Sequence, residues 1–452
     1  MSSLAFAAPR RTLGSAHRRA TGGSAMSTTS NPPATSVNEA AESELAARVR
    51  IQGPLRSLLL WFMPGTLGIF ILWGAIPTVL LPLQVEQLDP ANKVANLAIV
   101  TTIGALAAMI MQPVAGTISD RTRSRFGSRA PYIVGGALFG GAALVALGFS
   151  SSILMVALCW VLVQVSFNIV QGPFSAMLPD RVPESVRGTF AAMIGAMTMV
   201  GSLGGVILAS LLSASIRGAY LVLAGTSLVL LTLFAVFTGP RDNRGEPRPP
   251  FRLVDAARTF WVNPVAHPDF FWAFTGRLLL YTGYFLVVAY QLYLLQDYIG
   301  LGAGAVALLP LVSAAALPTL VLAVAVSGPW SDRVGRRKPF VVASSLIVAL
   351  AQVVPWVWPT FEGMIVFALL AGLGFGAFQA VDTALVSQVL PDSHAHAKDL
   401  GVINIAATLP QTIAPAIAGL VVLAFGFVGL FPAAIALSVL GALAVLPIRS
   451  VR

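Results

Sequence analysis

Charged residues are scarce in this sequence. Only 10% of its 452 residues are Asp, Glu, Lys or Arg, whereas 56% are hydrophobic. A soluble protein carries about 25% charged residues, because it has to cover its surface with groups that water solvates. The composition therefore excludes an ordinary soluble globular protein. It indicates that lipid is the solvent for much of the chain.

Cysteine is almost absent as well. The single cysteine, Cys159, lies in an apolar run, so the chain cannot form an internal disulfide and a cysteine-based metal site is not expected. None of the four histidines falls well inside an apolar run, and His394 and His396 lie in a loop, so we expect no metal. The sequence also lacks a phosphate-binding loop, which argues against transport driven by ATP. We expect no cofactor.

The apolar residues are gathered in runs of membrane-spanning length. Backbone groups in hydrocarbon must be paired internally, so these runs are expected to be helices of roughly 20 residues. They lie at about 58–85, 94–119, 131–149, 152–177, 189–214, 218–239, 269–297, 301–330, 339–358, 362–389, 400–424 and 427–448. The sequence thus predicts an all-α integral membrane protein with twelve transmembrane helices.

The same pattern predicts the domain organisation. Six runs precede a polar stretch and six follow it. We expect a disordered cytoplasmic tail, a six-helix bundle, a cytoplasmic linker and a second six-helix bundle, at 1–55, 56–239, 240–268 and 269–452. Either Met1 or Met26 could be the translation start.

Basic residues indicate the orientation. If the N-terminal tail is cytoplasmic and the sides alternate, every Lys and Arg falls on the cytoplasmic side except Lys93 and Arg217, while Arg277 lies within a span. Topology therefore explains the net charge of +10, and we expect no nucleic-acid partner. The prediction is a multi-pass protein of the cell membrane, surrounded by lipid, with both termini cytoplasmic.

A short basic loop occurs twice. Gly116–Pro131 and Gly328–Pro339 each join the second and third spans of their half. Asp120 recurs as Asp332 at an offset of 212, and Leu178-Pro-Asp180 recurs as Leu390-Pro-Asp392 at the same offset. Three coincidences at one offset predict that the two bundles are pseudo-symmetric repeats in parallel order.

The residues of this loop have a physical role. We expect Gly116 and Gly328, near helix ends, to let two helices approach closely. Asp120 and Asp332 are acids at helix C-terminal ends, where the helix dipole disfavours them, so each needs a compensating partner. Such a contact could form in one conformation and break in another.

These motifs resemble those of the major facilitator superfamily. Gly-x-x-x-Asp-Arg-x-Gly-Arg-Arg at 328–337 is similar to its hallmark loop, and the longer first copy is similar to that of the glycoside/pentoside/hexuronide and sucrose-type cation symporters. The resemblance implies the major facilitator fold and secondary transport by alternating access. It implies a gating role for Gly116, Asp120, Arg121, Arg129, Gly328, Asp332, Arg333 and Arg336; the alternative is that they only set topology.

The loop at 178–188 also resembles the family. We expect its basic residues to pair with the acids of the first motif loop, with a solvated turn as the alternative.

Two ionisable residues are predicted well inside spans. Arg277 and Asp382 each lie about eight residues from the cytoplasmic end of their helix, which is a depth of roughly 12 Å. Equal depth and opposite charge make them a candidate ion pair. By the resemblance, spans 1, 4, 7 and 10 line the central cavity, so the pair is a candidate for proton coupling. A static buried pair is the alternative.

Amide side chains mark a candidate solute site. Gln164, Asn168 and Gln171 share one face of the fourth span, and Phe375, Gln379 and Asp382 repeat that stripe in the tenth at an offset of 211. Tyr290 and Gln291 add to it from the seventh. Amides beside aromatic rings suit a neutral polyhydroxylated solute such as a sugar, whereas hydrogen bonding between helices is the alternative. Glu86 and Asp297 are expected to be interfacial.

The preferred hypothesis is a monomeric, proton-coupled sugar or glycoside symporter that moves a small-molecule solute. Melibiose-type members of the resembled branch carry acids in the second helix for sodium, and the span at 94–119 has none, which favours protons or no coupling. An exporter of drugs or metabolites is the alternative within transport. A transporter-derived sensor or membrane enzyme is a further one, but no nucleophile clusters with a base in the spans, so no enzyme activity is expected.

Overall fold

The structure, a computed structural model, describes residues 53–238, 242–245, 267–388 and 396–448. These residues belong to one compact unit. Nearly all of the predicted tail, most of the linker predicted at 240–268, and both Asp392 and His394 lie outside the described residues.

The described chain is helical. In the first half, α2 (Pro54–Ala75) runs through η1 (Ile76–Leu80) into α3 (Leu81–Leu88), and is followed by α4 (Lys93–Arg121), α5 (Ala130–Gly148), α6 (Ile153–Arg181), α7 (Glu184–Leu211) and α8 (Ile216–Phe237). The second half contains α10 (Pro268–Val288), α11 (Gln291–Tyr293), η2 (Leu294–Tyr298), η3 (Gly302–Gly304), α12 (Ala305–Val334), α13 (Lys338–Val357), α14 (Phe361–Gln388), α15 (His396–Phe425), η4 (Phe427–Gly429) and α16 (Leu430–Ala444).

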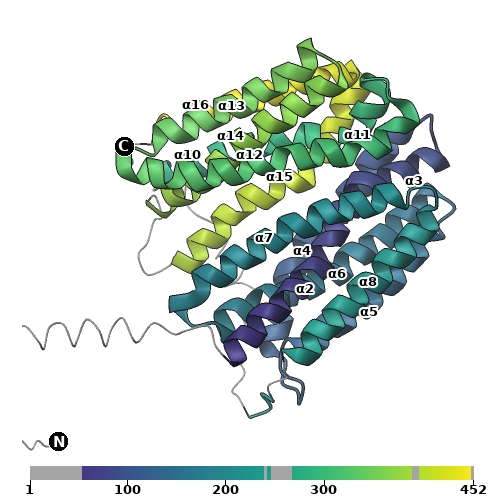
Figure 1. Cartoon of the computed structure of the whole chain (residues 1–452), viewed down its shortest axis with the longest axis vertical. Helices are drawn as coiled ribbons and strands as arrows, with labels where there is room; N and C mark the ends of the chain where they lie inside the picture. Colours follow the sequence, from purple (N-terminus) through teal and green to yellow (C-terminus); the bar gives the residue numbers. More distant parts are fainter. Residues whose placement is uncertain (1–52, 239–241, 246–266, 389–395, 449–452) are drawn as a thin grey trace, which may run out of the picture. The chain divides into compact units, whose positions relative to one another are not determined.

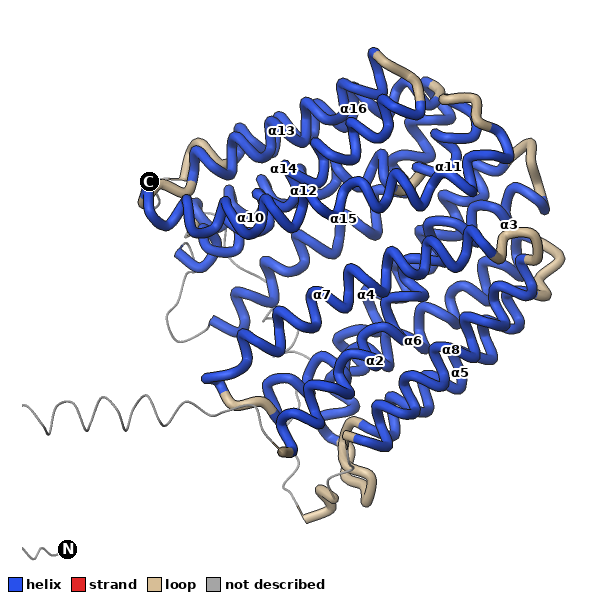
Figure 2. The backbone as a smooth tube through the Cα atoms, in the orientation of Figure 1, coloured by secondary structure: helices blue, strands red, loops and turns tan. Residues whose placement is uncertain are grey.

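Twelve of these helical segments are long and apolar enough to cross a membrane, which confirms the predicted number of spans. Figure 2 shows only helices and connecting loops in the part of the chain that is described. The seventh span differs from the prediction of one helix at 269–297. Helix α10 ends at Val288, and the chain resumes as α11 and the π-helical turn η2.

The helices form two groups that follow the sequence. In Figure 1 the first-half helices, purple to teal, lie together, and the second-half helices, green to yellow, lie together. Across the halves α4 packs against α15, and α7 packs against α12. These four helices are also the least buried of the twelve spans. This is expected of helices that have the other half on one side and the surroundings on the other.

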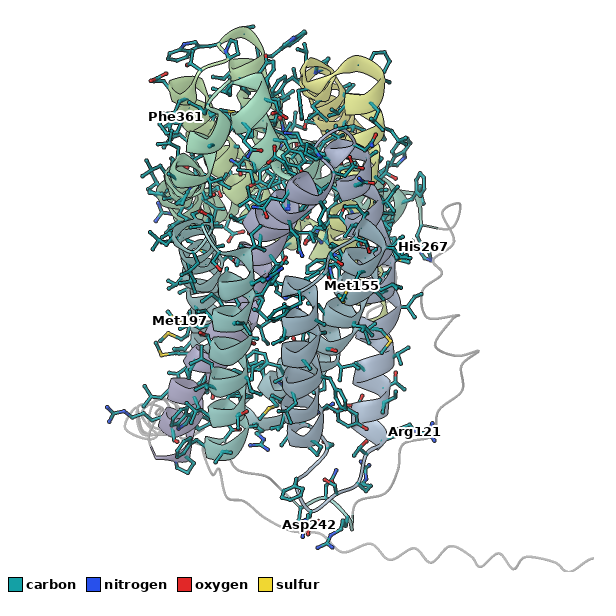
Figure 3. The ribbon with its side chains drawn as sticks, turned by 90° about the vertical axis from the view of Figure 1, so that its right-hand side faces the viewer. Arg121, Met155, Met197, Asp242, His267 and Phe361 are labelled. Carbon is teal, nitrogen blue, oxygen red and sulfur yellow. The ribbon has the colours of Figure 1, made fainter. Side chains whose placement is uncertain are left out.

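The two ends of the bundle can be told apart by their loops. We call the end with loops 122–129 and 335–337 the motif end, and the end with loops 89–92 and 299–301 the opposite end. In Figure 3, Arg121 lies at the lower, motif end and Phe361 at the upper, opposite end. The motif loops share one backbone feature: Gly127 has a φ of 80° and Gly335 one of 67°. Glycine adopts this left-handed conformation without the steric cost that a side chain would add.

Helices α2 and α7 approach closely enough to exclude side chains. A Cβ atom built on Gly205 would lie 2.1 Å from the carbonyl oxygen of Ile71, and one built on Gly74 would lie 1.9 Å from that of Ser202. On the motif-end side of this contact, Phe62 of α2 is fully buried and packs edge-on against neighbouring rings. Glycine therefore sets the spacing between the first and fifth spans.

Gly205→Ala should lower the free energy of unfolding by about 1–3 kcal/mol, because α2 and α7 would have to separate. The matched control is Gly204→Ala, since a Cβ atom at Gly204 would meet nothing within 4 Å. Thermal unfolding of both variants in detergent measures the difference. Equal unfolding midpoints would contradict the close contact.

Candidate functional site

The predicted pair of Arg277 and Asp382 is present. Arg277 lies on α10 and Asp382 on α14, and Nε of the arginine is 3.2 Å from Oδ2 of the aspartate. Their side chains are 11% and 3% exposed. Within the described residues, neither of these two atoms has a partner in hydrogen-bond geometry. The pair is thus held by charge, and it keeps hydrogen-bonding capacity that a ligand could use.

Aromatic rings surround this pair. The Arg277 guanidinium lies 5.7 Å from the centre of the Tyr281 ring. Tyr281 meets Phe375 edge-on at 5.0 Å, and Tyr284 stacks on Phe375 at 4.3 Å. Gln379, one turn before Asp382 on α14, is exposed. The second half therefore presents an ion pair, an amide and a wall of aromatic rings.

The predicted amide stripe on α6 is only partly available. Gln164 and Asn168 are buried, and Nδ2 of Asn168 donates to the backbone oxygen of Gln164 at 2.8 Å. Gln171 is half-buried, and its Oε1 accepts a hydrogen bond of 3.3 Å from Nε1 of Trp73 on α2. Gln164 and Asn168 are thus buried and bonded to each other within α6, while Gln171 faces α2.

Two tryptophans of this region were not predicted as site residues. Trp73 and Trp160 meet edge-on with ring centres 6.4 Å apart. The indole N–H of Trp160 is buried and has no hydrogen-bond partner among the described residues. A sequence signal existed, because Trp160 lies four residues before Gln164 and shares its helix face.

Tyr290 and Gln291 lie where α10 gives way to α11. The Tyr290 hydroxyl donates to the backbone oxygen of Val94 on α4, 3.1 Å away, and Tyr293 donates to that of Pro82 at 2.8 Å. Gln291 is buried beside them. Tyr290 was predicted to bind solute, but its hydroxyl is engaged in a bond between the halves at the opposite end. The helix break at Ala289 and Tyr290 turns the ring toward α4.

A lysine joins the halves at this end. Nζ of Lys93 lies 2.6 Å from Glu86 of its own half and 2.8 Å from Asp297 of the other half. Nε2 of Gln296 donates to Glu86 at 3.1 Å. We call Glu86, Lys93, Gln296 and Asp297 the clasp. Glu86 and Asp297 were expected to be merely interfacial, and the structure instead makes them the acids of an inter-half contact.

At the motif end, one arginine holds two acids. Arg129, at the start of α5, lies 2.5 Å from Asp120 at the end of α4 and 2.8 Å from Asp180 at the end of α6. It also donates to Ser119 at 3.1 Å. The buried Asn243 anchors the same loop, since it donates to the oxygen of Thr122 and accepts from the N–H of Ser124. This unit ties three helices of the first half together.

The contact between the first motif loop and the segment at 178–188 differs from the expectation. We expected basic residues at 178–188 to pair with the acids of the first loop. One salt bridge between the loops has the opposite sense, because the first loop supplies Arg129 and the later loop supplies Asp180. Arg181 donates to the oxygen of Thr238, and Arg187 to that of Val182. Arg121 is exposed at the end of α4.

The second copy pairs its acid with an arginine that was not among the predicted gating residues. Nη2 of Arg337 lies 3.0 Å from Asp332, and its Nη1 donates to the backbone oxygen of Ala384 on α14. Arg333 and Arg336 are exposed. Arg129 lies two residues before Pro131, and Arg337 lies two residues before Pro339. The two arginines therefore occupy equivalent positions relative to the helix that follows.

Comparison with known proteins decides the family. The model of the Major Facilitator Superfamily matches residues 58–323 and again 273–452. The chain belongs to the Major Facilitator Superfamily. It is therefore a secondary transporter for a small solute and not an enzyme.

Curated relatives within this superfamily match over part of the chain. The general alpha-glucoside permease of Schizosaccharomyces pombe is 28% identical over 169 residues, which cover 32% of this chain and 31% of the permease. The sucrose transport protein SUT1 of Oryza sativa subsp. japonica is 29% identical over 124 residues, which cover 23% of each chain. The matched segment is thus less than a third of either relative.

Solved structures resemble the fold over most of the chain. The nucleoside transporter NupG (D323A mutant) superposes with a TM-score of 0.68 at 15% identity, covering 86% of this chain and 99% of that one. A bacterial homolog of the human lysosomal transporter Spinster gives a TM-score of 0.62 at 14% identity, covering 87% and 94%. At these identities the likeness confirms the major facilitator fold.

The motif glycines of the superfamily loop do not make the contact that was predicted. A Cβ atom on either Gly116 or Gly328 would meet nothing within 4 Å. The expected close helix contact is therefore wrong for this conformation. The faces of α4 and α12 that carry these glycines are unpacked at the motif end.

Arg277→Leu should destabilise the protein by about 3–5 kcal/mol, because it leaves the Asp382 carboxylate buried without a partner. Asp382→Leu should do the same for the arginine. The double variant should recover most of the loss. Thermal unfolding measures all three, with the exposed Arg217→Leu as a control expected to change stability by about 0.5 kcal/mol or less. Additive losses in the double variant would show that the two side chains do not interact.

Proposed function

We propose that this transporter is a proton-coupled symporter for a sugar or glycoside. The buried, incompletely hydrogen-bonded pair of Arg277 and Asp382 beside Gln379 and a wall of aromatic rings carries the proposal. An ionisable pair inside a membrane span is costly and calls for a functional reason. The names of the alpha-glucoside permease and sucrose transport protein support the same class of solute.

The proposed solute site uses both halves. Gln379, Arg277 and the Tyr281 hydroxyl offer donors and acceptors from the second half, and Gln171 with Trp73 offers them from the first. Sugar hydroxyls need such paired donors and acceptors, and the flat C–H faces of a sugar ring pack on aromatic rings. We also assign the buried side chains of Gln164, Asn168, Tyr290 and Gln291 to the surroundings that shape this site.

A small apolar pocket favours a glycoside over a bare monosaccharide. It has a volume of about 190 Å³ and lies beside Gln171, between α2, α6 and α7, with Phe70 and Phe174 among its walls. An apolar substituent on the sugar would fill it.

Proton coupling follows from competition within the ion pair. Removal of water favours a neutral carboxyl at Asp382, whereas the Arg277 guanidinium favours the carboxylate. A solute hydroxyl that draws Arg277 away would leave Asp382 to bind a proton. Solute and proton would thereby stabilise each other on the protein.

Alternating access is assigned to the two ends. We place the motif end in the cytoplasm, in keeping with the distribution of Lys and Arg. The clasp then closes the extracellular end, and the unpacked faces of Gly116 and Gly328 belong to an open cytoplasmic end. We propose that closure of that end brings these faces against the opposite half. Asp120, Arg121, Arg129, Asp332, Arg333 and Arg336 would line the loops that move.

Proteoliposomes with an alkaline interior should accumulate a labelled α-glucoside or sucrose above its external concentration. Asp382→Asn should abolish this accumulation and retain exchange of internal for external sugar, because exchange needs no net proton movement. Trp73→Ala should raise the half-saturation concentration roughly tenfold, which corresponds to loss of one good aromatic contact. Wild-type uptake that ignores the pH gradient would contradict proton coupling. Uptake of apolar drugs but not sugars would favour the exporter.

Lys93→Gln should open the extracellular end, because it removes the salt bridge to Asp297 of the other half together with the one to Glu86. The reporter is Ala98→Cys in a Cys159→Ala background, since Ala98 faces Gly419 of α15 at that end. A membrane-impermeant maleimide should label it severalfold faster in the Lys93→Gln protein. Arg217→Gln removes a cation from the same end that stacks on Phe149 within the first half, and it should leave the rate unchanged.

Gly116→Leu should have the opposite effect on the same reporter. A leucine fits the open conformation but would obstruct closure of the motif end, so labelling of Ala98→Cys should stay slow even with Lys93→Gln present. Fast labelling in that combination would show that the Gly116 face is not part of the gate.

A further inference from the structure

A groove in the first half takes no part in the proposed transport. It lies between α5 and α6 and has a volume of about 670 Å³. Phe139 and Leu162 on its walls are 75% and 55% exposed, so it opens to the surroundings. Helix α5 packs against α6 and α8, whereas the second half packs on α4 and α7. The groove therefore faces lipid rather than the space between the halves.

Glycine creates the depth of this groove. A Cβ atom on Gly136 would meet Val170 at 2.7 Å and the oxygen of Ser166 at 2.9 Å, so α5 and α6 are in close contact along the floor. At Gly135, by contrast, a Cβ atom would meet nothing within 4 Å. The groove thus has a tight floor and an empty volume above it, bordered by large side chains.

Its dimensions suit a single acyl chain. The lining residues on α5 run from Pro131 to Ala146, a distance of roughly 22 Å along the helix. One leaflet occupies about half of a hydrocarbon core that is roughly 30 Å thick. The groove is therefore longer than the roughly 15 Å of one leaflet, and it can hold the whole acyl chain of a lipid whose headgroup lies at the motif end.

An exposed basic residue lies in the loop that adjoins this end of the groove. Tyr132 lines the groove, and its hydroxyl shares a 2.6 Å hydrogen bond with Thr122, the first residue of the motif loop. The loop presents Arg125, which is exposed and lies 4.6 Å from the ring of the half-exposed Phe126. A cation beside an aromatic ring at the membrane surface suits a phosphate headgroup.

We propose that this groove is a binding site for one phospholipid with an anionic headgroup, whose acyl chain lies between α5 and α6 and whose phosphate lies beside Arg125. Burial of an acyl chain gains little over the bilayer, because both are hydrocarbon. Selectivity therefore comes from the headgroup, and one basic residue near the surface is worth roughly a fivefold preference. The site is independent of the solute that the protein transports.

Native mass spectrometry of the full-length protein in detergent tests the site. The protein is titrated with phosphatidylglycerol and, separately, with phosphatidylcholine of the same chains. We expect one phosphatidylglycerol to bind roughly fivefold more tightly than phosphatidylcholine. Gly135→Leu, which fills the groove, should weaken the binding of both lipids at least severalfold. Arg125→Gln should remove the preference, because it weakens the binding of the anionic phosphatidylglycerol more than that of the zwitterionic phosphatidylcholine.

The control is Gly225→Leu on α8. Gly225 is exposed, and a Cβ atom there would also meet nothing within 4 Å, but it lies outside the groove. It should bind both lipids as the wild type does. Ala142→Leu, seven residues beyond Gly135 on the same helix face, is a second filling variant if Gly135→Leu fails to fold. Wild-type lipid binding in a folded filling variant would overturn the site, and a preference that survives Arg125→Gln would overturn the headgroup assignment.

Discussion

A charge in hydrocarbon needs a counter-charge close by, and the arrangement of this protein's few charged side chains follows from that requirement. At each end of the first half a single cation holds two acids, Arg129 at one end and Lys93 at the other. Within the second half, the described structure pairs the buried Arg277 with the buried Asp382. Helices, loops and candidate site are all arranged around these pairings.

The two end clusters differ in what they connect. Arg129 ties together α4, α5 and α6, so its acids all belong to the first half, and the cluster can move with that half as a unit. Lys93 joins Glu86 of the first half to Asp297 of the second, so this cluster must break if the halves separate there. The sequence suggested that Asp120 would be the contact that forms and breaks. In the structure, the contact that joins the two halves is the clasp.

Much of the fold could be predicted because lipid leaves the chain few choices. Hydrocarbon admits helices, so the apolar runs predicted twelve spans, and the repeat at an offset of 212 predicted two halves. Depth along a helix is easily counted, which is why Arg277 and Asp382 could be matched. The Lys93 clasp was missed because it depends on how the ends of four segments meet. The helix break at Tyr290 could not be predicted, because no proline or glycine lies at that position.

The remaining errors have local causes. Arg337 was missed because the helix start at Pro339, rather than the motif itself, determines which arginine turns back toward the acid. Trp160 was passed over although it shares the helix face of Gln164, and Trp73 was missed because an apolar run gives no sign of where an indole N–H points. The packing of Gly116 and Gly328 depends on the conformation, and a sequence cannot specify which of two conformations is being described.

The proposed proton coupling requires that Asp382 gains and loses a proton as solute binds. Infrared difference spectroscopy of the protein in lipid, with and without an α-glucoside or sucrose, measures the carboxyl C=O stretch directly. If Asp382 is the proton site, a protonated-carboxyl band should change when solute binds to the wild type. The band should be missing from the difference spectrum of Asp382→Asn, while the variant still binds solute. A difference spectrum that is identical in the two proteins would contradict it.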